Sequence, residues 1–323
     1  MLIMKLSVTI ITYNHERYIS QAIDSILAQR VNFDYEIVIG EDCSTDRTRA
    51  VIMDFQRRYP DRIVTLLRDR NIGVMRNFAG TIEACRGQYV AFLEGDDYWT
   101  ATDKLQKQVD FLDAHLDFAI CCHRVQSLYE AGSENFDVKF KVFPPRPAGL
   151  YTIEDLLRGN FVMTCSTVLR RELISPFPKW FFDMKLGDWG LCAMVARHGK
   201  IELMDETMAT YRVHPGCTWS SLPETTRLRE SARMLRALDK ELRYQYTDAI
   251  LEAVAAPYLQ LAIAARLKGR RAETGHHLLN CVRNGGLRLP GTARTFIGLA
   301  TYMIIGPGYK MFSRLKDTPH ANN

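Results

Sequence analysis

Two hydrophobic patterns alternate along the first part of the chain. The run Leu6–Thr12 is almost continuous in apolar and β-branched residues, which is typical of a strand buried on both faces of a parallel sheet. Apolar residues then recur at helical spacing from Ile19 to Leu27, and a second strand-like run follows at Tyr35–Ile39. This order predicts a β-α-β unit.

The same alternation continues to about residue 130. A helix is expected from Ser44 or Thr45, either of which can cap it, to Tyr59, where Pro60 ends it. Later strand-like runs and one helical pattern follow in the order Ile63–Leu67, Tyr89–Leu93, Lys104–Leu112 (helical) and Ala119–Val125. Alternating strands and helices predict an α/β fold with an open, mostly parallel sheet flanked by helices.

The pattern becomes less regular after residue 130. Residues 131–150 are rich in Gly and Pro, so a long loop or an irregular hairpin is expected, and such a loop beside a site can act as a lid. Shorter elements are expected at Ile153–Leu157, Ser166–Leu169, Asp188–Arg197 and in a strand-like stretch that ends at Tyr211. From Glu224 the pattern is helical. We therefore expect a first domain over residues 1–222 and a basic, mainly helical region over residues 223–323.

Composition places the chain among ordinary globular proteins. Of 323 residues, 47% are hydrophobic and 24% are charged, which excludes collagen-like and mostly disordered chains. The eight cysteines form no C-x-x-C pair, so neither a zinc site nor a disulfide framework is indicated. The first residues lack the regions of a signal peptide, and a cytoplasmic location is expected.

The net charge of +5 is the sum of two unlike parts. Residues 1–220 carry 26 Lys and Arg against 29 Asp and Glu, whereas residues 221–323 carry 16 against 8. Between Thr274 and Lys316 there are six basic residues, no acid and many apolar side chains, which suits peripheral contact with an anionic membrane. A helical subdomain that packs on protein explains the same pattern. No nucleic-acid-binding motif is present, so no nucleic-acid partner is expected.

Acidic residues gather where two predicted strands end. Glu41 and Asp42 follow one strand, and Glu94 precedes the pair Asp96 and Asp97 after another. Carboxylates at neighbouring strand ends repel one another unless a cation binds among them, and Mg²⁺ or Mn²⁺ with a diphosphate fits such oxygen ligands. The first strand lacks G-x-G-x-x-G and the chain lacks a P-loop, which argues against dinucleotide oxidoreductases and P-loop NTPases.

Residues 4–125 resemble the family 2 glycosyltransferases of GT-A fold, a Rossmann-like architecture. The matching segments are SVTIITYNHERYISQAIDSILAQ at 7–29, EIVIGEDCSTDRT at 36–48, Asn71-x-Gly73 with Arg76-Asn77, and GQYVAFLEGDDYW at 87–99. GDWGL at 187–191 and YRVHPG at 211–216 match less closely. The resemblance implies a GT-A catalytic domain with a C-terminal helical extension, and a nucleotide-sugar donor.

The resemblance also implies where the donor and a metal ion bind. Carried over by position, the nucleotide-binding residues are Thr12, Tyr13, Asn14, Glu41, Asp42, Arg76, Glu94 and Asp96. Metal ligands are expected among Asp96, Asp97 and His214, with Mn²⁺ or Mg²⁺ as the cofactor, and the sequence leaves open which aspartate is the main ligand. Arg76 fits a solvated charge at a helix start equally well. His15 is expected to be a surface residue.

Asp188 matches the late aspartate that acts as the general base of inverting members. An acceptor hydroxyl must lose its proton as it displaces the diphosphate, and a carboxylate can take that proton. Capping the helix that begins here is the alternative role for Asp188. Gly187 and Trp189 beside it suit a tight turn that stacks on a sugar.

These observations predict an inverting, metal-dependent glycosyltransferase that uses a nucleotide sugar, a UDP-sugar by preference, and a glycan or lipid-linked acceptor, as in bacterial surface polysaccharide synthesis. Through its C-terminal region it would contact the inner face of the plasma membrane.

Two alternative functions remain. A nucleotidyltransferase that forms nucleotide sugars should carry a Gly-rich loop with a basic residue after the first strand, which this chain lacks. A non-catalytic glycan-binding relative is kept open by the Glu residues at 41 and 94.

Overall fold

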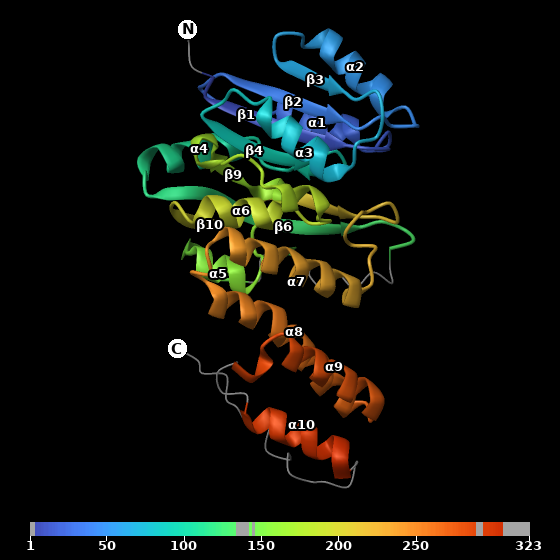
Figure 1. Ribbon diagram of the computed structural model, residues 1–323. Coiled ribbons are helices and arrows are strands. Elements are labelled where there is room, and N and C mark those ends of the chain that lie inside the picture. The colour runs from blue at the N-terminus through green and yellow to red at the C-terminus, as the bar shows by residue number, and fades with distance from the viewer. Residues whose placement is uncertain (1–3, 134–141, 144–145, 289–292, 306–323) are drawn as a thin grey trace. The chain divides into compact units, whose positions relative to one another are not determined.

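The structure is a computed structural model that describes residues 4–133, 142–143, 146–288 and 293–305 (Figure 1). The chain forms two compact units. The first comprises Met1–Leu242 and the second Arg243–Asn323. Each is described by itself.

One large sheet forms the core of the first unit. Its strands follow the order β3-β2-β1-β4-β9-β6-β10-β5, with β7 paired to β6 and β8 to β10. Their bounds are β1 Leu6–Thr12, β2 Tyr35–Glu41, β3 Ile63–Leu67, β4 Tyr89–Glu94, β5 Tyr98–Trp99, β6 Phe118–Tyr129, β7 Val142–Phe143, β8 Gly149–Tyr151, β9 Val168–Arg170 and β10 Lys200–Val213. Strands β3, β2, β1 and β4 are parallel, and so are β6 and β10. The three-residue strand β9 runs antiparallel to both β4 and β6 and joins the two sets. The predicted mostly parallel α/β sheet is therefore confirmed.

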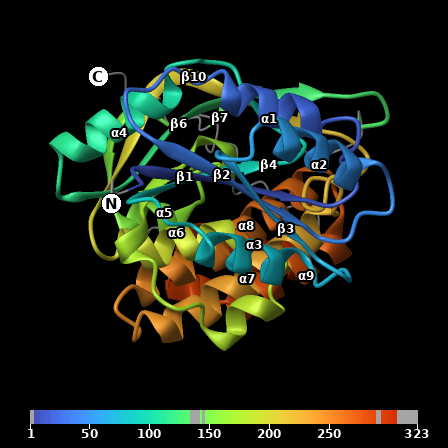
Figure 2. The ribbon, with the colours of Figure 1, turned by 90° about the horizontal axis from the view of Figure 1, so that it is seen from above.

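Helices cover both sides of this sheet. Their bounds are α1 Ile19–Leu27, α2 Thr48–Arg58, α3 Val74–Glu83, α4 Lys104–Ala114, α5 Ile153–Arg158, α6 Asp188–Ala196 and α7 Glu224–Glu241. Seen from above, α1 and α4 lie on one side of the strands and α3 and α6 on the other (Figure 2). The apolar side chains of α1 and α4 pack with the buried residues of β1 and β2 in one continuous core. This burial holds the strand ends in a fixed frame.

The division between the two units and the loop expected at residues 131–150 differ from the sequence-based expectation. Helix α7 belongs to the first compact unit, so the division between units follows Leu242 rather than residue 222. Met234 of α7 is fully buried, and its sulfur lies 3.5 Å from where a side chain on Gly190 of α6 would begin. The lid expected at 131–150 includes residues 134–141 and 144–145, which lie outside the described residues. Within the same stretch, β7 and the first two residues of β8 extend the sheet.

The second unit is helical, as predicted. It contains α8 Thr247–Leu267, α9 Arg271–Arg283 and α10 Ala293–Ile305. Side chains of these three helices share a small apolar core that includes Ala255, Cys281 and Leu299. By length and composition α8 could cross a membrane, although a third of its most apolar window is buried inside the protein. The basic residues Lys310, Arg314 and Lys316 lie outside the described residues.

Candidate active site at the carboxyl edge of the sheet

The carboxyl ends of the parallel strands meet at one edge of the sheet. Glu94 ends β4, Thr12 ends β1, and Glu41 ends β2, which pairs in register with Thr12. Strand β10 runs in the same direction and delivers His214 to this edge directly after Val213. Because ligands of open α/β sheets bind beyond these strand ends, the edge is the candidate site.

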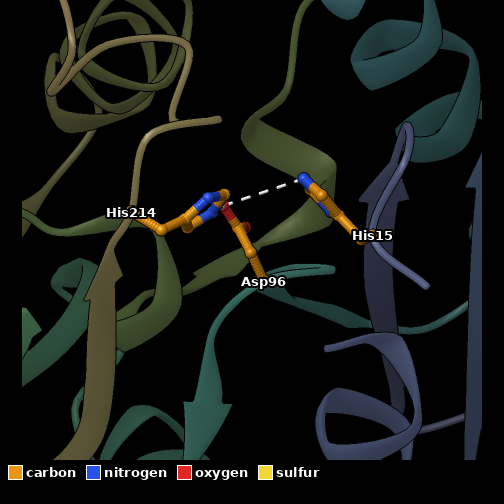
Figure 3. A group of neighbouring side chains, drawn as sticks. All are labelled: His15, Asp96 and His214. Carbon is orange, nitrogen blue, oxygen red and sulfur yellow. Dashed lines mark hydrogen bonds and ion pairs between the residues drawn. The ribbon is translucent and has the colours of Figure 1, made fainter. Parts of the chain in front are cut away.

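Three side chains at this edge converge on one point (Figure 3). The Nε2 atom of His214 lies 3.0 Å from Oδ2 of Asp96, and Nε2 of His15 lies 3.8 Å from the same oxygen. The ligand atoms of the three residues all lie within 4.8 Å of one another. Although burial acts to raise it, His15 and His214 hold the pKa of Asp96 below its ordinary value. His15 was expected to be a surface residue, and the structure places it in this cluster.

Two interlocked loops set the position of His15. The loop after β1 and the loop after β2 exchange hydrogen bonds: His15 N–H donates to Thr48 Oγ1 at 2.8 Å, and Thr45 N–H donates to the side-chain oxygen of Asn14 at 2.8 Å. Asn14 has a φ of 59°, a left-handed conformation that Asn tolerates better than most residues. Gly95 lets the β4–β5 turn come close to this loop, since a Cβ there would lie 2.8 Å from Nδ1 of His15.

Asp97 does not join the cluster. Its side chain is buried, and its Oδ1 accepts a hydrogen bond from the backbone N–H of Arg212 at 2.8 Å. Burial, followed by the charges of Asp96 and Glu94, raises the pKa of Asp97 well above its ordinary value. Of the two aspartates left open as the main metal ligand, the geometry therefore brings Asp96 to the candidate metal position, and Asp97 ties β10 to the β4–β5 turn.

A second carboxyl pair lies beside this cluster. Asp188 is the first residue of α6, and its Oδ2 accepts a hydrogen bond from Thr164 Oγ1 at 3.0 Å. Burial raises the pKa of Asp188. Burial also raises the pKa of Glu94 to about 8, and the charges of Asp96 and Asp188 add to this shift. Gly187 holds the cap position of α6, and among the described residues no side chain makes a cap hydrogen bond there. The backbone N–H of Trp189, in the first turn, interacts with the Asp188 carboxylate and acts to lower its pKa, so a role at the start of the helix stands beside that of a base.

The two acids at the end of β2 have different environments. Glu41 is fully buried, and its carboxylate accepts hydrogen bonds from the backbone N–H of Ser44 and from Nε of Arg49, both at 2.5 Å. Asp42 accepts hydrogen bonds from the backbone N–H groups of Ile72 and Gly73 at 2.8 and 3.0 Å. Glu41 thus fixes the loop that follows β2, whereas Asp42 fixes the loop before α3.

The remaining candidates border the same edge. The side chain of Thr12 is buried with its Oγ1 3.2 Å from Nδ1 of His15, whereas Tyr13 is 42% exposed. Arg76, on the first turn of α3, is exposed and stacks over the ring of Phe182 at 5.1 Å. Trp189 was expected to stack on a sugar, and this is wrong. Its indole is buried and donates a hydrogen bond to the backbone oxygen of Leu156, because the ring packs in the core beneath α6.

Comparison with known sequences finds relatives over the first two thirds of the chain. Residues 7–175 match the profile of glycosyl transferase family 2. Protein Rv1520 of Mycobacterium tuberculosis is 39% identical over 218 residues, which cover 67% of this chain and 61% of that protein. The poly(ribitol-phosphate) β-N-acetylglucosaminyltransferase TarS of Staphylococcus aureus is 31% identical over 114 residues, which cover 35% of this chain and 19% of that protein.

Solved structures share the fold. The structure of S. aureus TarS 1–349 in complex with UDP-GlcNAc superimposes with a TM-score of 0.63 at 17% identity, covering 94% of this chain and 89% of that chain. The mannosyltransferase PcManGT from Pyrobaculum calidifontis, in complex with GDP-Man and Mn²⁺, gives a TM-score of 0.52 at 17% identity, covering 94% and 85%. The expected GT-A fold is thereby confirmed.

Proposed function

Because the chain belongs to glycosyl transferase family 2, we propose that it is an inverting glycosyltransferase that moves a sugar from a nucleoside-diphosphate donor to an acceptor hydroxyl. One observation carries this proposal. A buried carboxylate whose pKa is raised, Asp188, lies beside Glu94 at the same sheet edge as the cluster of His15, Asp96 and His214. A base and a cation site side by side are what the displacement of a diphosphate requires.

The donor atoms of the cluster fit a divalent ion. Ligand atoms roughly 2.1 Å from an octahedral ion lie about 3.0 Å apart at right angles, and Asp96 and His214 are separated by 3.0 Å. His15 needs to move by less than one ångström to reach the same spacing from Asp96. Two imidazoles favour Mn²⁺ over Mg²⁺, which prefers oxygen ligands. When bound, the ion would supply positive charge that stabilises the departing diphosphate.

Asp188 would perform the proton transfer. As the acceptor oxygen bonds to the anomeric carbon, the bond from that carbon to the diphosphate breaks, and the acceptor proton passes to the Asp188 carboxylate. Thr164 donates a hydrogen bond to one carboxylate oxygen of Asp188 and so helps to fix its orientation. The raised pKa makes Asp188 a stronger base than an exposed aspartate.

Asp42 and the first-strand residues support a nucleotide at the same edge. Each carboxylate oxygen of Asp42 accepts one backbone hydrogen bond and retains a second lone pair for the N–H of a base. Tyr13, half exposed beside it, offers a ring face. A uracil base fits these groups, and UDP-GlcNAc bound to TarS makes a UDP-sugar the first donor to test.

A donor screen tests the proposal. Purified protein is incubated with UDP-, GDP- and dTDP-sugars and Mn²⁺, and thermal stabilisation and nucleotide release are measured. We expect a UDP-sugar to stabilise the protein only when Mn²⁺ is present, and Asp188→Asn to slow transfer by at least about 100-fold while retaining that stabilisation. Full turnover by Asp188→Asn would refute the role of the base, and absence of stabilisation by every donor would refute the activity.

We assign the acceptor to glycans or lipid-linked saccharides at an anionic membrane, as in the synthesis of surface polysaccharides. The second unit is basic and exposes large apolar side chains: Leu267 is 82% exposed, Leu287 70% and Ile297 57%. Leu267→Asn with Leu287→Asn should reduce sedimentation with vesicles that contain phosphatidylglycerol. Leu116→Asn, at an equally exposed position (81%) in the first unit, is the matched control. Equal sedimentation of all three proteins would refute membrane contact.

A further inference from the structure

Arg212 is the most extensively bonded side chain near the candidate metal site. It lies on β10, two residues before His214, and its side chain is 8% exposed. Its Nε donates to the backbone oxygen of Asp96 at 2.7 Å, one terminal nitrogen donates to Glu130 at 3.1 Å and the other to Gln21 at 2.6 Å. Every nitrogen of the guanidinium is therefore directed at a different element of the fold.

Glu130 links the same guanidinium to a tyrosine. Its Oε1 accepts from Arg212, and its Oε2 accepts from the hydroxyl of Tyr18 at 2.7 Å. The ring of Tyr18 packs against two groups: the Arg212 guanidinium lies 4.8 Å from its centroid, and the centroid of the His214 ring lies 4.8 Å from it. Tyr18 thus provides a wall against which the His214 imidazole packs.

These contacts reach two of the three residues of the metal cluster by separate routes. Arg212 holds the β4–β5 turn through the main chain of Asp96, and its own backbone N–H holds Asp97. Glu130 accepts a hydrogen bond from Tyr18, and the Tyr18 ring packs against the ring of His214. A largely buried ion pair contributes little net stability, because desolvation offsets its attraction, so its placement points to a geometric role.

We propose that Arg212, Glu130 and Tyr18 are positioning residues that set the spacing of the Asp96 carboxylate and the His214 imidazole for a divalent cation. This inference rests on the proposed metal-dependent function. Partners one shell away from a metal fix the orientation of its ligands, and their loss typically weakens metal binding by about 10- to 100-fold.

The test measures Mn²⁺ binding directly, without turnover. The dissociation constant for Mn²⁺ is determined by electron paramagnetic resonance of the free ion for the full-length wild type, Glu130→Gln, Arg212→Lys and Tyr18→Phe. We expect the dissociation constant for Mn²⁺ to rise about 10-fold or more in Glu130→Gln and Arg212→Lys. A smaller rise is expected in Tyr18→Phe, which removes one hydroxyl. Melting temperatures are recorded in parallel.

Glu36→Gln is the matched control. Glu36 is also buried and also pairs with an arginine, Arg86, but it lies on β2 at the opposite end of the strands from the site. We expect this variant to have a lower melting temperature and a dissociation constant for Mn²⁺ within twofold of the wild-type value.

If the dissociation constants of Glu130→Gln and Arg212→Lys also stay within twofold of the wild-type value, the positioning role is refuted while metal binding stands. If the wild type binds no Mn²⁺ and Asp96→Asn changes nothing, both the positioning role and the metal-dependent function fail. If either variant does not fold, Tyr18→Phe decides, since unchanged affinity there overturns the inference.

Discussion

Lys104 gives the sharpest test of the electrostatics of the core. Its side chain is fully buried, its Nζ donates to Gln108 Oε1 at 2.7 Å, and it lies 4.1 Å from the centroid of the Trp99 ring. Burial lowers the pKa of Lys104 from 10.5 to about 7. The unfolded chain therefore binds a proton between these two pH values that the folded protein does not bind.

The sign and size of the effect follow from this difference. Because the unfolded state binds more protons, stability rises with pH by about 1.4 kcal/mol per unit between the folded and the unfolded pKa. Between pH 7 and pH 10 the Lys104 contribution amounts to about 4 kcal/mol. Lys104→Met removes this pH dependence. The free energy of unfolding of the variant, compared with that of the wild type, should therefore be higher at pH 7 than at pH 10 by about 4 kcal/mol. The lost hydrogen bond to Gln108 costs the same at every pH and cancels from the comparison.

The assay is urea unfolding at several pH values, followed by tryptophan fluorescence. The four tryptophans at positions 99, 180, 189 and 219 all lie in the first compact unit, so the signal reports that unit alone. Lys107→Met is the control, since Lys107 lies on the same helix with its amine exposed beside Glu206. Parallel stability curves for the wild type and Lys104→Met would refute the assignment of a buried, largely neutral lysine.

Three further predictions concern the sheet edge. Because burial raises the pKa of Asp188, the rate of transfer should fall on acidification at a higher pH than it would with an ordinary aspartate. Asp188→Asn should lower kcat about 100- to 10,000-fold. A rate that does not fall in this pH range would contradict the role of Asp188 as the base. Glu41→Gln should lower the free energy of unfolding by about 2 kcal/mol, because Arg49 loses its charged partner; unchanged urea midpoints would count against this. Gly95→Ala should weaken Mn²⁺ binding about 10-fold, because the new Cβ would press on His15, and calorimetric titration that gives the wild-type affinity would rule it out.

The sheet was predictable because its strands are continuous apolar runs of ordinary length. All the predicted strands are present, and Asp188 was placed correctly at the start of a helix. Helix α3 was missed, although Met75, Phe78, Ala79 and Ile82 recur at helical spacing on its buried face. The same face also buries two polar residues: Asn77 donates a hydrogen bond to the backbone oxygen of Gly40, and Thr81 is fully buried.

The site was less predictable, since its side chains are placed by contacts between distant segments. His15 carries no signal of its own, because its position depends on the loop that begins thirty residues later. Asp96 and Asp97 are adjacent and chemically alike, yet the backbone N–H of Arg212, more than a hundred residues away, binds one of them. Such long-range pairings cannot be read from local spacing.

Strand β9 makes the order of synthesis relevant to the site. Strands β3, β2, β1 and β4 are complete once residue 94 has been made, whereas the path from β4 to β6 in the sheet runs only through Val168–Arg170 among the described residues. A nascent chain shorter than this holds the loops that carry His15 and Asp96, together with β5, but lacks β10, the strand that pairs with β5 and delivers His214. The candidate cation site is therefore complete only when β10 has joined the sheet, after the first half already exists.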